Sequence, residues 1–226
     1  VSHELRNPLS VVRATAETLP DVPQPSQAKL LKTLIRNAER MSAIVTDLLD
    51  LSRIEAGQYD LEPTRLNVRE CVENSIQSTV ERIASRKHEL DVQIDNALDC
   101  VADQTALEQV LVNLIDNAAK YTPERGHLCV RAFALDDETA RIEVQDDGPG
   151  IPKKYRERVF ERFYRVDKGR SRAVGGTGLG LAIVKHLVQE MRGSVGLEEV
   201  TTGGSCFWLE LPRGEDTDED SPTSPR

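Results

Sequence analysis

Apolar residues at the start of the chain recur at alternating spacings of four and three. The stripe that they form contains Leu5, Leu9, Val12, Ala16 and Leu19. Such a stripe is typical of a helix that packs against other helices. At about 100° per residue, His3 lies roughly 165° from the middle of this stripe, so we expect its side chain to point at solvent, with Asn7 one turn further on the same side.

Pro8 lies inside this helical pattern. It has no amide proton for the carbonyl of Glu4, which predicts a loosened or kinked backbone one turn after the histidine. The pattern alone does not distinguish His3 from an ordinary solvated surface residue.

A second helical stripe follows the stretch LPDVPQPSQ, whose three prolines end the first helix. This stripe contains Leu31, Leu34, Ala38, Met41, Val45 and Leu48, and is broadened by Ile35, Ile44, Leu49 and Leu51. One hairpin cannot bury both stripes, whereas two hairpins paired in a homodimer form a four-helix bundle. The alternative that these helices pack onto the rest of the chain stays open.

The chain after Gly57 changes from long helices to mixed elements. Periodicity predicts helices over residues 68–86, 104–121 and 179–191, and strands over 88–95, 128–135, 140–146, 194–200 and 205–212. These elements predict an α/β sandwich, with helices on one face of a mixed sheet. The fold class is therefore α+β, with a helical region over 1–57, an α/β region over 58–213 and an acidic tail over 214–226 that we expect to be disordered.

Composition narrows the functional classes. A net charge of -9 over 226 residues argues against nucleic acid as the main partner. Four widely spaced cysteines without a C-x-x-C pair argue against a metal or disulfide framework and fit a reducing cytosol. No apolar run approaches the length of a membrane span. Because the sequence starts with Val1 inside a helical pattern, we expect a missing upstream segment, through which alone the parent protein could be attached to a membrane.

Three polar side chains gather on one side of the helix predicted over 104–121. Asn113, Asn117 and Lys120 lie within about 60° of each other and roughly 115° from its apolar face. Two amides and an ammonium group suit a hydrated cation and phosphate oxygens, because amide carbonyls can ligate Mg²⁺ and lysine supplies a point charge. Taken alone, the pattern also fits an ordinary solvated helix face.

The stretch VQDDGPGIP places a carboxylate, Asp146, at the end of a predicted strand, followed by Gly148 and Gly150. A carboxylate held there can accept a hydrogen bond from an exocyclic amine, and the glycines let a flat ring approach the backbone. A simple turn is the alternative for this stretch in isolation.

The stretch GGTGLGLAI sets Gly176, Gly178 and Gly180 ahead of a helix, where bare amides and the helix N-terminus favour anions. Neither G-K-[ST] nor G-x-G-x-x-G is present, which excludes a P-loop and a dinucleotide fingerprint. The preceding segments, FERFYRVD and KGRSRAVGG, are aromatic and basic enough to form a lid over a polyphosphate.

Five of these stretches, in this order, resemble the boxes of bacterial sensor histidine kinases. HELRNP, NLIDNAAKYTP, DDGPGIP, FERFYRVD and GGTGLGLAI are similar to their H, N, G1, F and G2 boxes. The resemblance covers nearly the whole chain apart from the tail. It implies the cytoplasmic catalytic core of a membrane sensor kinase, with a dimerisation and phosphoacceptor domain followed by an ATP-binding domain of the GHKL type. It also implies ATP and Mg²⁺ as cofactors, and a homodimer and the receiver domain of a response regulator as partners.

The resemblance assigns roles to particular residues. It makes His3 the phosphoacceptor and Glu4 the general base that polarises the imidazole. In the N box it implies phosphate contacts for Asn113 and Lys120, Mg²⁺ ligation for Asn117 and a nucleotide contact for Tyr121.

In the remaining boxes, the resemblance makes Asp146 the acceptor of the adenine amine, in a pocket shaped by Gly148 and Gly150. Arg165 would approach the γ-phosphate. The hinge and phosphate side of the lid would consist of Gly176, Gly178 and Gly180. Asn7 stands where threonine is usual in the family, which leaves autokinase activity expected and the strength of phosphatase activity open.

The resulting hypothesis is a protein-histidine kinase that phosphorylates His3 and passes the phosphoryl group to an aspartate of a response regulator. One alternative is an ATP-driven conformational machine of the chaperone, gyrase or mismatch-repair type, which HELRNP and the helical hairpin disfavour. Another is a nucleotide-sensing module without turnover, which the intact Glu4, Asn117 and Asp146 disfavour. His88, His127 and His186 match no motif, and we expect them to be surface groups.

Overall fold

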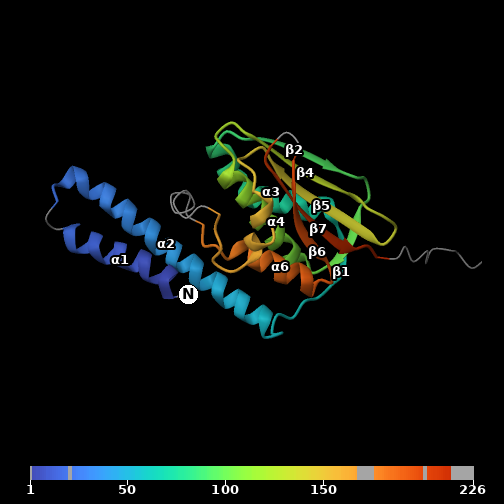
Figure 1. The fold of residues 1–226 in the computed structure, drawn as a ribbon, viewed down its shortest axis with the longest axis horizontal. Coiled ribbons are helices and arrows are strands. Elements are labelled where there is room, and N and C mark those ends of the chain that lie inside the picture. Colours follow the sequence, from blue (N-terminus) through green and yellow to red (C-terminus); the bar gives the residue numbers. More distant parts are fainter. Residues whose placement is uncertain (1, 20–21, 167–175, 201–202, 215–226) are drawn as a thin grey trace, which may run out of the picture.

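The computed structural model describes residues 2–19, 22–166, 176–200 and 203–214, without the side chains of Ser2, His3 and Pro25. Helix α1 (Ser2–Thr18) lies along the first half of the longer helix α2 (Gln24–Glu55), so that the second half of α2 extends beyond it (Figure 1). Helix α1 continues through Pro8. The two long helices expected from the apolar stripes are therefore present as a hairpin.

The seam between the two helices differs in part from the stripe expected on α1. Pro8 and Thr15 are buried, whereas Leu9 is 52% exposed and Ala16 is also exposed. The buried and half-buried residues of α1 keep the same alternation of three and four, but they include a proline and a threonine. The contact of α1 with α2 therefore uses Pro8 and Thr15 beside the apolar residues, while Leu9 and Ala16 of the expected stripe stay exposed in the single chain.

The rest of the described chain is built on one mixed sheet of five strands. In spatial order these are β2 (Glu89–Ile94), β4 (His127–Ala134), β5 (Thr139–Asp146), β7 (Ser205–Pro212) and β6 (Ser194–Glu199). β2 and β4 are parallel, and the other neighbours are antiparallel. Helices α3 (Val68–Ser85), α4 (Gln104–Tyr121) and α6 (Gly180–Glu190) cover one face (Figure 1). This arrangement confirms the α+β class and the helices laid on one sheet face.

Helix α4 has the bounds expected from its periodicity, and its sequence shows why. Asp103 caps its N-terminus, because its Oδ1 accepts a hydrogen bond of 2.8 Å from the amide of Ala106. Such a cap contributes about 1 kcal/mol. Leu107, Leu111 and Leu114 on its apolar face are fully buried. Cap and face together fix how α4 presents its polar side.

Two short strands were not expected from the sequence. β1 (Thr64–Asn67) pairs antiparallel with β3 (Asp99–Ala102) in a separate two-stranded sheet. Four residues are too few to establish an alternating pattern, and the pairing joins segments far apart in the chain. Two 3-10 turns, η2 (Lys153–Tyr155) and η3 (Arg158–Phe160), were also missed.

The hairpin has two different apolar faces on α2. Ile44, Leu51 and Ile54 are at most 2% exposed and belong to the same buried cluster as Ile183 and Leu187 of α6. On the other side, four large apolar residues of α2 are 45–58% exposed, namely Leu31, Ile35, Val45 and Leu49. The second half of α2 therefore packs onto the α/β region, as the alternative left open from the sequence had it, while a second apolar face stays exposed.

One histidine contradicts the sequence expectation. His88 is buried between the end of α3 and α4, with its Nε2 3.0 Å from the carbonyl oxygen of Ala119. It is therefore a packed structural residue, and its expected surface position was wrong. His127 is exposed, as expected.

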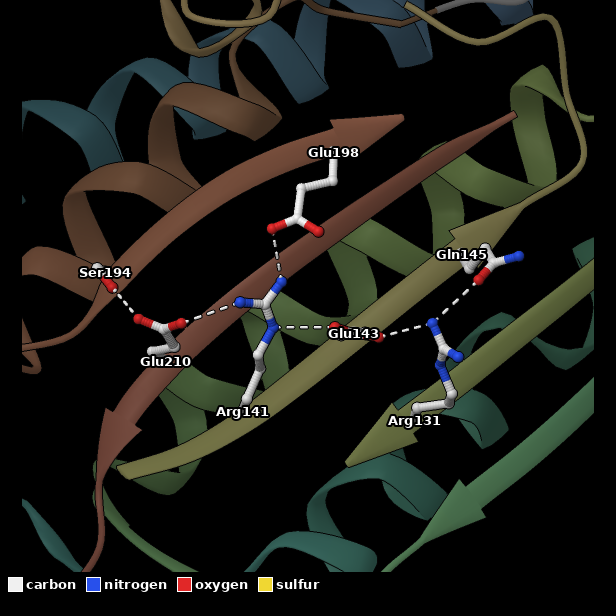
Figure 2. A network of polar contacts seen from close by, with 7 residues as sticks. All are labelled: Arg131, Arg141, Glu143, Gln145, Ser194, Glu198 and Glu210. Atoms are coloured by element: carbon white, nitrogen blue, oxygen red, sulfur yellow. Dashed lines mark hydrogen bonds and ion pairs between the residues drawn. The ribbon is translucent and has the colours of Figure 1, made fainter. Parts of the chain in front are cut away.

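The sheet face away from the helices carries a network of charges (Figure 2). Arg141 on β5 donates hydrogen bonds to Glu143, Glu198 and Glu210 at 2.8–3.1 Å. Its guanidinium also lies 4.6 Å from the ring centroid of Trp208. Arg131 on β4 adds an ion pair of 2.8 Å to Glu143. This outer-face network links strands β4, β5, β6 and β7.

Candidate functional site

A cavity of about 280 Å³ lies between α4, the end of β5 and the start of α6. Residues from distant stretches of the sequence line it together. The candidate residues in its lining are Asn113, Asn117, Lys120, Tyr121, Asp146, Gly150, Arg165, Gly176, Gly178 and Gly180. The fold therefore brings the N, G1, F and G2 stretches into one site.

Apolar and aromatic side chains make up the other part of the lining. These residues, none of them singled out from the sequence, are Ile151, Val159, Tyr164, Leu181 and Phe207. A mainly apolar cavity with a few convergent polar groups is typical of a small-molecule site. A planar heterocycle can lie against these side chains while its substituents meet the polar ones.

Asp146 is the least exposed of the charged residues that line the cavity, with 5% of its surface exposed. Burial raises the pKa of its carboxyl group to about 6, against hydrogen bonds from the backbone of Gly148 and Ser205 that favour the ionised form. The bond from the Gly148 amide to Oδ1 is 2.8 Å long. At neutral pH the group is therefore a fixed acceptor with lone pairs left for a ligand N–H group.

The glycines after Asp146 leave no room for a side chain. A Cβ atom on Gly148 would lie 2.7 Å from Oδ1 of Asp146. Gly150 has a φ angle of +69°, and its Cβ would lie 2.9 Å from the carbonyl oxygen of Gly204. Both positions therefore keep the backbone close to the floor of the cavity. Gly148 itself does not line the cavity but holds Asp146 in place.

The amides of α4 differ in what they contact. Asn113 donates a hydrogen bond of 2.9 Å from Nδ2 to the carbonyl oxygen of Gln109. Its Oδ1 faces the start of α6, where a Cβ on Gly180 would lie 2.6 Å away. Asn117 lines the cavity, and its side chain makes no hydrogen bond to the described residues. Its amide group is thus available to a ligand.

Asp116 is a lining residue that the sequence analysis missed. It forms ion pairs with Lys120 on its own helix and with Arg82 on α3. The spacing of four residues between Asp116 and Lys120 is a signal that could have revealed the pair. Asp116 holds the Lys120 ammonium group at the edge of the cavity.

Arg165 lies at the opposite edge, and its side chain is 7% exposed. Its Nη2 donates a hydrogen bond of 2.5 Å to the carbonyl oxygen of Gly176, and its Nη2 is 3.6 Å from Oε2 of Glu4. Oε2 of Glu4 is also 3.7 Å from Nη2 of Arg40. Most of the expected lid, residues 167–175, lies outside the described residues.

The first turn of α1 therefore lies beside the cavity. His3 precedes Glu4 in this turn, and its side chain lies outside the described part of the chain. Asn7 is exposed. Neither Glu4 nor Asn7 lines the cavity, so the structure separates the candidate residues into a cavity group and a helix group that meet at Arg165.

Two acidic residues of α2 also contact the α/β region. Asp47 hydrogen-bonds the side chain of Thr177, a cavity residue, and burial raises the pKa of its carboxyl group. Glu55 contacts Arg162, and its Oε1 lies 3.4 Å from Nε2 of His186. No local pattern could have revealed contacts between residues more than 100 positions apart.

No three acidic, histidine or cysteine side chains cluster around a metal-sized space in the part of the chain that the structure describes. A divalent cation in this cavity would therefore rely on amide oxygens and on oxygens of the ligand itself. Among the described residues, no helix combines the length and apolar character that crossing a membrane requires.

Comparison with known families agrees with this geometry. Residues 102–215 match the family of histidine kinase-, DNA gyrase B- and HSP90-like ATPases, and residues 1–57 match the His kinase A phospho-acceptor domain. The chain is 36% identical to the signal transduction histidine-protein kinase/phosphatase MprB of Mycobacterium avium, over 93% of this chain and 41% of MprB. It spans about two-fifths of the length of the curated relatives that it matches.

Solved structures resemble the whole described fold. The Acinetobacter baumannii histidine kinase AdeS is 25% identical, with a TM-score of 0.77 over 94% of this chain and 98% of that chain. The histidine kinase ThkA, solved in complex with the response regulator protein TrrA, is 24% identical, with a TM-score of 0.77 over 96% of this chain and 61% of that chain. The hairpin and the α/β region thus occur together in related proteins.

Proposed function

Because the chain belongs to the sensor histidine kinases, we propose that its α/β region binds ATP and transfers the γ-phosphoryl group to His3. One observation carries this proposal. Arg165, a cavity residue, lies against Glu4, the residue after the proposed phosphoacceptor. Phosphoryl transfer depends mainly on positioning and on neutralising charge. The contact of Arg165 with Glu4 holds the cavity beside the turn of α1 that contains His3.

Asp146 and the apolar lining suit the adenine end of ATP. The ionised carboxylate would accept a hydrogen bond from the exocyclic amine, and the apolar side chains would cover the ring. The start of α6, Lys120 and Arg165 offer positive charge to the triphosphate. Asn117 is the group that would hold Mg²⁺, since its amide is free of other described partners and Mg²⁺ takes most of its ligands from phosphates and water. Bound there, Mg²⁺ would neutralise part of the negative charge of the triphosphate.

The unprotonated imidazole nitrogen of His3 attacks the γ-phosphorus while the bond to the β–γ bridging oxygen breaks, and ADP leaves. The proton on the other ring nitrogen passes to Glu4, which acts as general base. The product is a phosphoramidate, a reactive bond from which the phosphoryl group can move to a carboxylate.

We further propose that the phosphoryl group passes to an aspartate of a response regulator receiver domain, and that the same surface supports phosphatase activity. The name of MprB, kinase/phosphatase, and the complex of ThkA with a response regulator support this proposal. The exposed residues Leu31, Ile35, Val45 and Leu49 support a homodimer, because pairing two hairpins would cover them.

A label-transfer assay tests the kinase function. The protein is incubated with γ-labelled ATP, and the label is then challenged with acid and with base. We expect acid-labile, base-stable label on the parent and on His127→Gln, which changes an exposed histidine that does not line the cavity. We expect none on His3→Gln, although its nucleotide affinity stays within about twofold, since the two functions lie in separate regions.

Label retained on His3→Gln would overturn the assignment of the phosphoacceptor. Release of inorganic phosphate without protein label would favour an ATP-driven machine, and neither label nor phosphate would favour a nucleotide-sensing module.

A further inference from the structure

We infer that each chain phosphorylates its own His3, so that autophosphorylation occurs in cis within the dimer. This inference rests on the proposed kinase function. It is carried by the contact surface between α2 and the α/β region, which we call the docking face and define by Ile44, Asp47, Leu51, Ile54 and Glu55.

The docking face has a continuous apolar centre. Ile44, Leu51 and Ile54 are 0%, 1% and 2% exposed, and they share one buried cluster with Ile183 and Leu187 of α6. Burial of this extent is typical of a packed interior rather than of a passing contact. The α/β region is therefore held against the hairpin of its own chain.

Polar contacts fix the register of this docking. Near the end of α2, Glu55 contacts Arg162 and His186. About two turns earlier on α2, Asp47 hydrogen-bonds Thr177 at the cavity. Beside α1, Arg165 reaches Glu4. The docking thus sets the phosphate side of the cavity against the first turn of α1, where His3 lies.

The docking face and the exposed apolar face lie on opposite sides of α2. At about 100° per residue, the mean direction of Ile44, Leu51 and Ile54 is roughly 170° from that of Leu31, Ile35, Val45 and Leu49. A second hairpin can therefore cover the exposed face without displacing the docked α/β region. Dimerisation and docking within one chain are compatible, so the dimer offers no reason for the catalytic region to cross to the partner.

The decisive experiment uses mixed dimers of differently tagged chains, purified on both tags. In the complementary dimer, one chain carries His3→Gln and the other Asp146→Asn. In the matched control dimer, one chain carries both changes and the other is unchanged. Each dimer contains the same two substitutions, and γ-labelled ATP is supplied near the dissociation constant of the parent.

We expect the control dimer to be labelled at about half the rate of the parent dimer, and the complementary dimer at least about tenfold more slowly than the control. Label on the complementary dimer together with an unlabelled control would overturn transfer in cis. An unlabelled parent homodimer would instead refute the proposed kinase function, so the two failures are distinguishable.

If the chains prove monomeric, a rate per chain that does not depend on protein concentration supports transfer in cis, and a rate that rises with concentration overturns it.

A charge reversal tests the docking face itself. Glu55→Arg and Arg162→Glu should each slow autophosphorylation about tenfold, because each sets like charges together. The two changes combined in one chain should restore the rate to within about threefold of the parent. Arg125→Glu, at an exposed loop position, is the control and should leave the rate unchanged.

In mixed dimers, Glu55→Arg in one chain and Arg162→Glu in the other should stay slow, since neither chain then holds both partners of a restored pair. Restoration in that mixed dimer, or single variants as fast as the parent, would overturn docking within one chain.

Discussion

The hairpin and the α/β region bury their apolar residues in different ways. The sheet, α4 and α6 enclose their large apolar side chains within one chain, with Leu107, Ile142 and Leu209 fully buried. The hairpin leaves Ile35 58% and Leu49 56% exposed. The α/β region, with the second half of α2 packed onto α6, therefore has its core completed within one chain, whereas the hairpin needs a partner to cover its outer face. The difference indicates that nucleotide binding belongs to one chain and assembly to two.

The largest effect expected from breaking this difference is on assembly. Val45→Glu places a carboxylate on the exposed face of α2, and in a two-fold dimer the change occurs twice. We expect the dissociation constant of the dimer to rise about 100-fold. Sedimentation equilibrium measures it, and Val80→Glu is the matched control. Val80 on α3 is 41% exposed against 46% for Val45, but it lies in the self-contained region. Equal effects of both variants would show that the hairpin face is not the dimer surface.

A second prediction addresses nucleotide binding in the self-contained region. Asp146→Asn replaces a carboxylate acceptor by a group that also presents a donor to the adenine amine. We expect a loss of about 2 kcal/mol, which is about thirtyfold in affinity. Titration calorimetry measures the affinity, and sedimentation should show an unchanged dimer. The nucleotide-free variant should be no less stable at pH 7.5, because it no longer buries a charge. An affinity equal to that of the parent would place the adenine pocket elsewhere.

A third prediction separates two activities on the hairpin. Asn7 is exposed on α1, away from the cavity, so its amide can orient a water beside His3. Asn7→Ala should keep autophosphorylation within a few-fold, while dephosphorylation of a phosphorylated receiver domain in the presence of ADP slows about tenfold. Asn7→Thr should preserve part of that rate. An unchanged decay with Asn7→Ala would remove Asn7 from the phosphatase, and loss of both activities would indicate local damage to the helix.

The smallest effect expected is a pH dependence confined to the cavity. Burial raises the pKa of Asp146 to about 6, so the folded protein keeps a proton there that the unfolded chain has released. The contribution of this group to folding stability is therefore present at low pH and is lost as the pH rises through about 6. Nucleotide affinity has the opposite sign, because the ionised carboxylate is the better acceptor. We expect the affinity to fall about fourfold from pH 7.5 to pH 5.5 in the parent, and to stay flat in Asp146→Asn.

The sequence predicted best where one element carries both a strong pattern and a clear end. Helix α4 is such an element, since its cap at Asp103 and its apolar face fix its bounds and its polar side. The glycine stretches were also readable, because Gly150 and Gly178 adopt φ angles of +69° and +80° that other residues rarely reach. The resemblance of the boxes, taken together, to one family predicted that residues from separate boxes line the same site.

The sequence could not predict features that depend on distant partners. The pairing of β1 with β3 and the burial of His88 against Ala119 leave no local pattern. The contact of Glu55 with Arg162 joins residues that are far apart in the chain. The apolar stripes of α2 could be read from the sequence, but not which of its faces meets α6 and which stays exposed. That choice depends on the shape of the whole α/β region.

The outer-face network has a further consequence for the assembled protein. A dimer tethers two sheets to one bundle at an effective concentration on the order of 1 mM. An apolar face at that concentration would favour sheet-on-sheet stacking. Arg141 instead ties Glu143, Glu198 and Glu210 into a charged layer, whose charges would have to be desolvated before two sheets could associate (Figure 2). In the proposed dimer, this charged layer would keep the two catalytic regions from stacking on each other, so that each stays available to its own hairpin.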